Sequence, residues 1–383
     1  MVDKWQKLKD ELKQAAQELG IDAIGIASPD PFVVLKERLI RHRELGRESG
    51  FEAKDLNRRT DPSLLFDRPK SIIAIAVAYS SKLDNAPKSD VGARRGIMAR
   101  SAWGNDYHYV LRERMDKLEA WLREREPQLR SESMVDTGEL SDRAVAERAG
   151  IGFSAKNCSI ISPELGSWIY LGEIITNLPL PPDDEVTEQC GTCTKCIDAC
   201  PTGALVSGGQ LDAQKCVSFL TQTKGMISDE HMRKIGNRLY GCDTCQIVCP
   251  INRGKNWTHH EDLLPDVEVA KPLLIPLLTI GNKEFKEKYG YTSAAWRGKK
   301  PIQRNAVIAL GNFKDSTAIP ALAKVLKDDP REVLRATAAW SLGRIGGDDA
   351  LIELESAISN EKDEEVIKQI TLSINNINSC NSK

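Results

Sequence analysis

The sequence predicts an α+β protein that ends in a helical repeat, and three observations support this fold class. Strand-like and helical patterns alternate irregularly over the first 180 residues, cysteines are concentrated in the segment that follows, and a helix–turn–helix unit is repeated near the C-terminus. A chain of 383 residues is also too long for one ordinary core. We therefore expect three domains: a mixed α/β domain (1–180), a cysteine-rich domain (181–265), and a linker followed by helical repeats (266–383).

The composition is that of an ordinary globular protein. Hydrophobic residues make up 41% of the chain and charged residues 28%, which excludes collagen-like, disordered and membrane-spanning proteins. No apolar run approaches the roughly 18 residues of a membrane-spanning helix. The first residues lack the apolar segment of an export signal, so we expect a cytoplasmic protein without a membrane partner. The formal net charge of −2 means that binding to a nucleic acid would depend on a local basic patch.

The first domain contains short elements of both kinds. Apolar residues recur at helical spacing over 4–19, where Gly20 follows as a stop signal, and β-branched runs indicate strands. The expected helices are 4–19, 35–47, 107–125 and 143–149. The expected strands are 22–27, 71–79, 132–136, 158–162 and 168–175. A proline-rich stretch over 178–184 then leads into the cysteine-rich domain.

Cysteine spacing in the second domain indicates iron–sulfur clusters. Eight cysteines lie between positions 190 and 249, and the first four follow the C-x2-C-x2-C-x3-C-P pattern of bacterial ferredoxins, in which the fourth thiolate binds a second cluster. The last three form a shorter group, and one isolated cysteine between the two groups can supply its missing ligand. The crossing pattern assigns to the first 4Fe–4S cluster Cys190, Cys193, Cys196 and Cys249, and to the second Cys200, Cys216, Cys242 and Cys245.

Structural zinc is the alternative for these cysteines, because C-x2-C pairs also form zinc ribbons. A three-cysteine run followed by C-P and shared between two centres is unusual for zinc, and eight thiolates are the number that two clusters need. Two further cysteines lie outside this set. We expect Cys158 to be a small buried residue and Cys380 to lie in the polar C-terminal tail.

The C-terminal segment contains an internal repeat of 32 residues. Leu310-Gly-Asn recurs as Leu342-Gly-Arg, and each unit has the pattern of a helix, a turn and a second helix, which is typical of HEAT-like repeats. The expected helices are 301–310, 318–326, 333–342 and 350–358, with 364–377 as a closing helix. Two repeats are few for a free solenoid, so they either act as a scaffold or contribute to binding. The basic stretch from Arg297 to Arg304 favours contact with phosphates.

Polar residues of the first domain concentrate in two places. The chain has no Gly-rich dinucleotide motif, no Walker A motif and no H-E-x-x-H. Residues 103–109 include Tyr107 and His108, and Asp136 follows a predicted strand at a Thr-Gly turn. Either burial raises the pKa of Asp136 and makes it a general acid, or its side chain caps its own turn. Tyr107 and His108 are likewise either a satisfied buried pair or catalytic residues.

Several motifs resemble those of one enzyme family across nearly the whole chain. The matching segments are 59–62, 104–108, 135–138, 147–153, 156–157 and 166–179, together with the split eight-cysteine pattern and the HEAT-like tail. In this combination the chain resembles the epoxyqueuosine reductases, cobalamin-dependent enzymes that complete the queuosine modification of tRNA. It departs from the family pattern at Phe153–Ala155, where many relatives have Trp and Gly, and at Cys158, where a Thr is common.

The resemblance implies a reaction in which a cyclopentane epoxide loses its oxygen and becomes an alkene. Low-potential clusters would pass electrons singly to a strongly reducing cobalt centre, and an acid would protonate the departing oxygen. Asp136, which matches the family's V-D-T-G motif, is the implied proton donor, while Tyr107 and His108 line the substrate side. An external low-potential electron donor is also implied, and an enzyme that holds one tRNA can act as a monomer.

The cobalamin contacts have a weaker signal, because the usual D-x-H-x-x-G motif is only approximated: Leu111 replaces the glycine after Asp106 and His108. The resemblance implies binding without a protein imidazole on cobalt, through backbone and small polar groups. Met98 either places a soft sulfur near cobalt or is an ordinary core residue. The expected contacts are Asn57, Met98, Ser141, Ser154, Lys156, Asn157 and Cys158.

A substrate in an anticodon loop requires RNA binding by a protein whose net charge is negative. Proteins read single-stranded loops by stacking and hydrogen bonding on splayed bases, and they hold the phosphates elsewhere. The expected phosphate contacts are Lys299, Lys300, Arg304, Lys215, Lys224 and Arg233.

Two other functions compete with this interpretation. A reductive dehalogenase also joins a cobalamin domain to two clusters, but respiratory members carry a twin-arginine export signal. In this chain Arg58-Arg59 and Arg94-Arg95 are internal, and no apolar segment follows them. A non-enzymatic electron-transfer adaptor would need clusters and a docking repeat, but it would not need so large an N-terminal domain.

Overall fold

The structure, a computed structural model, describes residues 3–381, with side chains described for 3–379. Packing divides the chain into two compact units. Unit 1 comprises Met1–Lys82, Asn105–Cys216 and Thr244–Leu264, and unit 2 comprises Leu83–Gly104, Val217–Asp243 and Pro265–Lys383. Within the described part of the chain, no helix has both the length and the apolar character that crossing a membrane requires.

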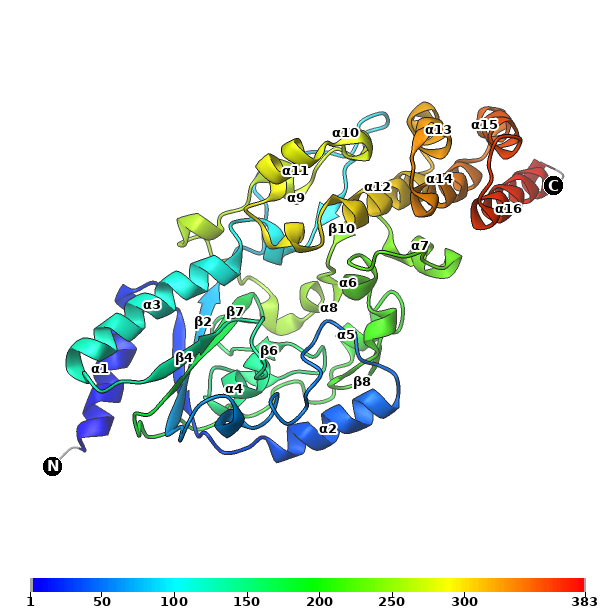
Figure 1. The fold of residues 1–383 in the computed structure, drawn as a ribbon. Coiled ribbons are helices and arrows are strands. Elements are labelled where there is room, and N and C mark those ends of the chain that lie inside the picture. Colours follow the sequence, from blue (N-terminus) through cyan, green and yellow to red (C-terminus); the bar gives the residue numbers. More distant parts are fainter. Residues whose placement is uncertain (1–2, 382–383) are drawn as a thin grey trace. The chain divides into compact units, whose positions relative to one another are not determined.

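A four-stranded antiparallel sheet forms the centre of unit 1 (Figure 1). Its order is β1 (Ala23–Ala27), β2 (Ser71–Ala78), β7 (Ile169–Thr176) and β4 (Ser131–Met134). β2 consists of apolar and β-branched residues apart from its first serine, and all eight of its residues are buried, as expected for a central strand covered on both faces. β4 is a short edge strand, and its C-terminal end leads into the loop that contains Asp136.

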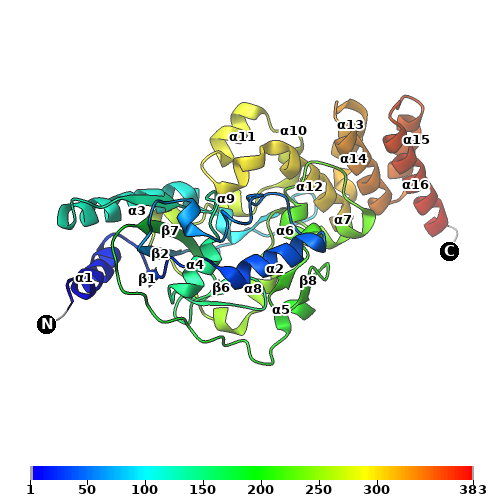
Figure 2. The ribbon, with the colours of Figure 1, turned by 60° about the horizontal axis from the view of Figure 1, so that its bottom comes forward.

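Helices cover both faces of this sheet (Figure 2). Ile73 and Ile75 of β2 face the helices α1 (Lys4–Glu18) and α3 (Tyr107–Arg125), while Ile72 and Ala74 face α4 (Asp142–Arg148). This alternation follows from the two-residue period of a strand. The predicted helix over 107–125 is confirmed, and it begins where the Asp106 carboxylate accepts the His108 N–H. In contrast, α2 (Val33–Glu44) has no buried residue.

Two short helices carry the cysteine motifs of unit 1. α5 (Lys195–Asp198) lies in the first motif and α8 (Thr244–Ile247) lies in the second, and these helices pack against each other. Each motif then reaches a Cys-Pro pair, and the proline cannot continue a helix. Two antiparallel hairpins complete this region: β5 (Phe153–Ser154) with β6 (Ile160–Ile161), and β8 (Leu205–Ser207) with β9 (Gln210–Leu211). β6 is shorter than the strand predicted over 158–162.

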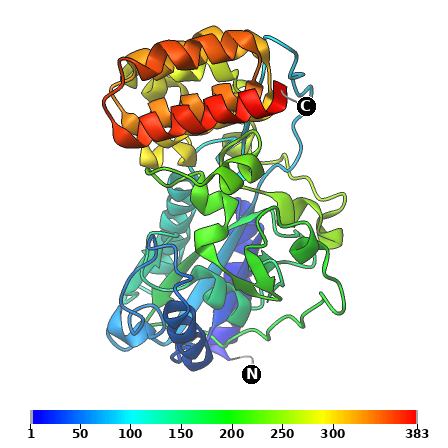
Figure 3. The same ribbon diagram turned by 90° about the vertical axis from the view of Figure 1, so that its right-hand side faces the viewer.

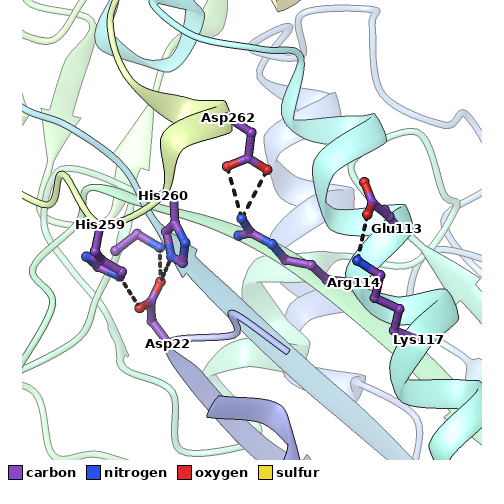
Figure 4. Close-up of polar contacts among 8 residues, drawn as sticks. Asp22, Glu113, Arg114, Lys117, His259, His260 and Asp262 are labelled. Atoms are coloured by element: carbon purple, nitrogen blue, oxygen red, sulfur yellow. Dashed lines mark hydrogen bonds and ion pairs between the residues drawn. The ribbon is translucent and has the colours of Figure 1, made fainter. Parts of the chain in front are cut away.

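The last segment of unit 1 is attached to the sheet domain by hydrogen bonds between side chains (Figure 4). The Asp22 carboxylate lies 2.6 Å from Nε2 of His259 and 2.7 Å from Nε2 of His260, and it also accepts the Ala78 N–H. Burial alone would raise the pKa of Asp22, but these hydrogen bonds lower it. Each oxygen of the Asp22 carboxylate therefore has one histidine partner. Arg114 of α3 makes a second tie, with two contacts of 3.1 Å to Asp262.

Unit 2 contains the helical repeats (Figure 3). The predicted helices are confirmed as α12 (Lys299–Phe313), α13 (Ile319–Asp328), α14 (Glu332–Ile345), α15 (Asp348–Ile358) and α16 (Glu364–Asn381). A Cβ on Gly311 would lie 2.8 Å from Ser341, and one on Gly343 would lie 2.6 Å from Ser373. Both pairs repeat at 32 residues, so the repeated Leu-Gly motif reflects close helix approach. The backbone of Cys380 lies in α16, but its side chain is outside the described part.

Further segments of unit 2 pack beside the first repeat helix. β3 (Ile97–Met98) pairs in parallel with β10 (Arg238–Tyr240), and α10 (Leu274–Thr279) contacts α12. Asn305 of α12 donates hydrogen bonds from Nδ2 to the carbonyls of Thr221 and Leu239, at 2.7 Å and 2.8 Å. Met98 is completely buried in the same apolar core.

Candidate active site and cluster pocket

The loop after β4 holds Asp136 in an uncommon backbone conformation. Its φ is 52°, in the left-handed region, which costs a residue other than glycine roughly 1–2 kcal/mol. Thr137 N–H donates to the Val135 carbonyl across this residue, and Asp136 N–H donates to Asp142 Oδ2 at 2.8 Å. The side chain of Asp136 remains 64% exposed. The loop therefore presents a carboxylate to the surface of unit 1 while it fixes the backbone from behind.

Two aromatic rings at the start of α3 face this carboxylate. Tyr107 donates its hydroxyl proton to Asp136 Oδ2 at 2.9 Å, and His108 Nε2 lies 3.4 Å from the same oxygen. Nδ1 of His108 lies 2.7 Å from Asp106. Tyr107 also stacks on Tyr170 of β7, with ring centroids 4.5 Å apart. The structure thus brings together the three predicted catalytic residues, and the Asp136 carboxylate is directed at the rings rather than at its own turn.

Protonation at this loop differs from the prediction. One of the two alternatives was that burial raises the pKa of Asp136, but the adjacent His108 lowers it, with further lowering by Tyr107 and Arg143, although desolvation acts in the opposite direction. Burial alone would lower the pKa of His108, yet Asp106 and Asp136 raise it to about 9. At neutral pH the proton therefore resides on His108, and Asp136 is a carboxylate beside an imidazolium.

Residues that the sequence analysis did not select support this loop. Asp106 holds Nδ1 of His108, and Asp142 accepts the Asp136 amide. Glu173 lies in the middle of β7 and is 1% exposed. An acidic residue within an otherwise apolar strand was a signal in the sequence, whereas nothing distinguished Asp142, which directly precedes the predicted helix over 143–149.

The predicted ligands of the first cluster surround one pocket in unit 1. Its lining includes the four thiols of Cys190, Cys193, Cys196 and Cys249, and its empty volume is about 390 Å³. Cys249 is 53 positions beyond Cys196, and the packing of α5 against α8 accounts for their approach. Burial raises the pKa of the Cys190 thiol to about 11, so thiolates form here when a metal displaces the protons.

The second predicted set of ligands is divided between the units. Cys200, Cys216 and Cys245 belong to unit 1, whereas Cys242 belongs to unit 2. This second assignment stays a prediction. All nine cysteines with described side chains have intermediate exposure, including Cys158, which was expected to be a small buried residue.

The loop between the hairpin strands β5 and β6 joins the cluster pocket to the Asp136 loop. Ala155, Lys156 and Asn157 line the pocket with the cysteines. The next residue, Cys158, has a φ of 65°, and its carbonyl accepts a hydrogen bond from Arg143, the neighbour of Asp142. A short path of contacts therefore runs from Asp136 through 142–143 and 158 to the four thiols.

The expected cobalamin contacts have different environments. Asn157 is buried and its Nδ2 has no acceptor among the described residues. Lys156 donates from Nζ to the carbonyls of Gly191 and Cys193, so its ammonium binds the loop that contains the first cysteines of the cluster motif. Ser154 donates to Glu147, and Ser141 caps α4 without a side-chain hydrogen bond.

Two other residues, Asn57 and Met98, were also expected to contact cobalamin. Asn57 is exposed in the loop before residue 62. Met98 requires a correction: its full burial in the apolar core of unit 2 gives its sulfur a packing role, and we no longer assign it a cofactor contact.

The expected phosphate contacts are corrected in part. Arg304 is 1% exposed, and its guanidinium donates to the carbonyls of Leu220, Thr223 and Gly225. Burial lowers the pKa of Arg304 to about 10, and a side chain so enclosed cannot hold a phosphate. Lys299 donates to the Ile280 carbonyl.

The other basic residues are exposed, but two of them have carboxylate partners. Arg233 pairs with Asp229, and Lys215 pairs with Asp212 at 3.3 Å. Lys224 and Lys300 are exposed, and their ammonium groups have no polar partner among the described side chains. These two lysines remain available for phosphate binding.

Comparisons with known proteins place this geometry in a family. Residues 59–137 match the family model "Epoxyqueuosine reductase QueG, DUF1730", residues 189–252 match "4Fe-4S double cluster binding domain", and residues 297–375 match "HEAT repeats". An epoxyqueuosine reductase of Bacillus anthracis is 60% identical over 96% of this chain and 96% of its own. The chain belongs to the epoxyqueuosine reductase family.

Solved structures of epoxyqueuosine reductases agree with this assignment. One, a crystal structure with an epoxyqueuosine-modified tRNA stem loop, has a TM-score of 0.95 and 56% identity, covering 98% of this chain and 100% of its own. Another, from Bacillus subtilis, has the same TM-score of 0.95 and 56% identity, with the same coverage, and its catalytic loop is swung out of the active site. The predicted α+β fold with a cluster domain and HEAT-like repeats is confirmed.

Family membership also decides between the alternatives. The chain is an oxidoreductase, which excludes the non-enzymatic electron-transfer adaptor. Its relatives of high identity are named epoxyqueuosine reductases, and this does not favour a reductive dehalogenase. The double-cluster match supports iron–sulfur clusters instead of structural zinc.

Proposed function

We propose that this chain reduces epoxyqueuosine in the anticodon of a tRNA to queuosine. The observation that carries the proposal is the short path between the Asp136 loop and the four-thiol pocket, because it joins a proton-transfer site to an electron-transfer site within one unit. The relatives' names and the tRNA stem loop in one of their structures supply the substrate class.

The reaction replaces an epoxide by an alkene and water, so it consumes two electrons and two protons. In this proposal Asp136 passes protons to the epoxide oxygen as its C–O bonds break. The imidazolium of His108, 3.4 Å from Asp136, resupplies the carboxylate. Tyr107 orients the same carboxylate oxygen through its 2.9 Å hydrogen bond. After each transfer the site is reprotonated from solvent, to which the Asp136 side chain is exposed.

Two 4Fe–4S clusters would supply the electrons. We assign Cys190, Cys193, Cys196 and Cys249 to one cluster, because these four thiols line one pocket. The second set keeps the assignment Cys200, Cys216, Cys242 and Cys245. The Lys156 ammonium lies at the carbonyls of Gly191 and Cys193, where its charge would favour the reduced, more negative state of a bound cluster.

Cobalamin fits the residues between the pocket and the Asp136 loop. Asn157 has a buried N–H without an acceptor among the described residues, and the Ser141 hydroxyl makes no capping bond. His108 is not available as a cobalt ligand, because its two ring nitrogens face Asp106 and Asp136. With Asn57, Ser154, Lys156 and Cys158 these residues would hold the corrin. When bound, reduced cobalt would supply the electron pair that cleaves the epoxide.

The tRNA phosphates are assigned to Lys224 and Lys300, with Lys215, Lys299 and Arg233 as weaker contributors because each already has a partner. The proposal also includes an external low-potential electron donor, a monomeric state, a cytoplasmic location and the three functional domains.

The proposal is tested with the loaded enzyme. The chain carrying both clusters and cobalamin is incubated without oxygen with a low-potential reductant and a stem loop that contains epoxyqueuosine, and nucleosides are identified by mass spectrometry. We expect queuosine to form, and Asp136→Asn to lower the single-turnover rate about 10²–10⁴-fold because it cannot relay a proton.

Asp116→Asn is the matched control, since Asp116 is exposed on α3. It is expected to leave the rate unchanged. Failure of the loaded wild-type chain to form queuosine would contradict the proposed function.

A further inference from the structure

Three side chains of unit 1 converge where the last segment of the unit meets the sheet (Figure 4). Asp22 directly precedes β1, whereas His259 and His260 lie 237 and 238 positions further along the chain. One carboxylate oxygen of Asp22 lies 2.6 Å from Nε2 of His259, and the other lies 2.7 Å from Nε2 of His260. One ligand atom from each of the three residues lies within 4.8 Å of the other two. Imidazole nitrogen and carboxylate oxygen are groups that bind zinc in proteins.

The two histidines point in the same direction although they are neighbours in the sequence. Their ring centroids are 4.1 Å apart and the rings are tilted by 50°, so that both Nε2 atoms reach the same carboxylate. One histidine would be enough to attach this segment to Asp22 by a hydrogen bond. Two imidazole nitrogens beside one carboxylate have, in addition, the composition of a zinc site with three protein ligands, in which water takes the fourth position.

The surroundings hold these ligands in place and leave one side open. The Asp22 carboxylate accepts the Ala78 N–H at 2.7 Å, and the Asp22 N–H donates to the Ala76 carbonyl. The side chains of His260 and Asp22 are 9% and 14% exposed, whereas that of His259 is 47% exposed. An ion and its water molecule therefore have access from the His259 side, while the other two ligands are shielded and fixed.

The cation closest to these ligands already has a carboxylate partner. Arg114 and His260 both have atoms within 4 Å of the position that a Cβ on Gly20 would take, so the guanidinium lies near the site. Its Nη2 makes two contacts of 3.1 Å with the Asp262 carboxylate, and this charge offsets the repulsion between Arg114 and a metal ion. Calcium and magnesium prefer sites built of oxygen ligands, whereas imidazole suits zinc.

We propose that Asp22, His259 and His260 bind one zinc ion, which attaches the last segment of unit 1 to the sheet. This ion is separate from the iron–sulfur clusters, and the inference does not depend on the proposed function. The ion would occupy the lone pairs of both Nε2 atoms, so it would replace the two hydrogen bonds instead of adding to them. Because the unfolded chain does not hold these three ligands together, zinc binding would stabilise the folded state.

The test uses the full chain with both clusters loaded, kept without oxygen and dialysed to remove loosely bound metal. Zinc chloride is added in a calorimeter, and we expect one zinc ion to bind per chain and to raise the temperature of thermal unfolding. X-ray absorption at the zinc edge is expected to show nitrogen and oxygen neighbours at about 2.0–2.2 Å and no sulfur near 2.3 Å. This spectrum distinguishes the proposed site from zinc bound to the cysteines.

His259→Gln separates metal binding from attachment by hydrogen bonds. The glutamine amide keeps an N–H donor for Asp22, but an amide is not among the usual zinc ligands. We expect this variant to unfold at nearly the wild-type temperature without zinc and to lose the increase that zinc causes. Its affinity for zinc should fall at least about tenfold, since losing a group that merely orients a ligand already costs that much. His42→Gln, on α2, is the control and should bind zinc like the wild type.

Three results would overturn the proposal: no zinc binding by the wild type, a sulfur shell around the bound zinc, or equal zinc affinity in the wild type and His259→Gln. The first result would show that hydrogen bonds alone attach the segment. None of these measurements uses tRNA or its reduction, so a failure of the proposed function would leave them decisive for the zinc site.

Discussion

At the scale of single residues, the carboxylates on either side of His108 determine where the proton rests before reaction. Desolvation opposes a charged imidazole, but Asp106 at 2.7 Å and Asp136 at 3.4 Å outweigh it and raise the pKa of His108 to about 9. Asp136 is correspondingly the stronger acid of the pair. Because His108 and Asp136 interact, the pKa values observed in a titration describe the pair and not either residue alone.

The pH dependence of the reaction follows from this pair. The folded-state pKa of His108 is about 9, above the ordinary value of about 6.5, so the ion pair is complete below the ordinary value and is lost as the pH rises through about 9. We expect the single-turnover rate to fall over this range. The His108→Gln variant should react more slowly at neutral pH, and its rate should no longer fall at basic pH. The control variant His42→Gln, on α2, should keep the pH dependence of the wild type. An unchanged fall at basic pH in His108→Gln would show that another group supplies the proton.

At the scale of elements, the helices that were predicted correctly are those with a clear local pattern in the sequence. The helix over 107–125 and the five repeat helices follow from apolar periodicity and caps, although the repeat helices are longer than predicted. Arg304, Met98 and Glu173 could not be placed in this way. Whether a polar or sulfur-containing side chain faces solvent or a core depends on partners that are distant in sequence, such as Leu220 for Arg304.

The close packing of helices in the repeats leads to a second prediction. Gly343→Ala places a Cβ 2.6 Å from the Ser373 side chain and 3.0 Å from its backbone. We expect a loss of about 1–3 kcal/mol in the free energy of unfolding, because two packed helices must separate. Denaturant unfolding measures this loss. Gly225→Ala is the control, since nothing lies within 4 Å of the added methyl group, and equal effects of the two variants would exclude close packing as the reason for the repeated glycine.

At the scale of the whole molecule, a net charge of −2 is compatible with tRNA binding only if the cationic groups that contact phosphate are local. The sequence shows a basic stretch from Arg297 to Arg304, but it could not show that the Arg304 guanidinium is bonded to backbone carbonyls. Lys224 and Lys300 remain as the exposed candidates without partners.

Charge reversal tests this assignment. Lys224→Glu with Lys300→Glu should weaken tRNA binding and reduce the slope of log affinity against log salt by about 0.7–0.9 for each phosphate that the variant no longer neutralises. Arg304→Lys should instead lower thermal stability, because the lysine cannot make all the hydrogen bonds of the buried guanidinium. An unchanged salt slope in the double variant would contradict the phosphate assignment of these lysines.

The most direct measurement of the central claim is the nucleoside composition of tRNA from cells that lack this gene, determined by mass spectrometry. The account predicts that epoxyqueuosine accumulates and queuosine is absent, and that the wild-type gene, but not the Asp136→Asn variant, restores queuosine. Normal queuosine in cells that lack the gene and any redundant enzyme would contradict the account.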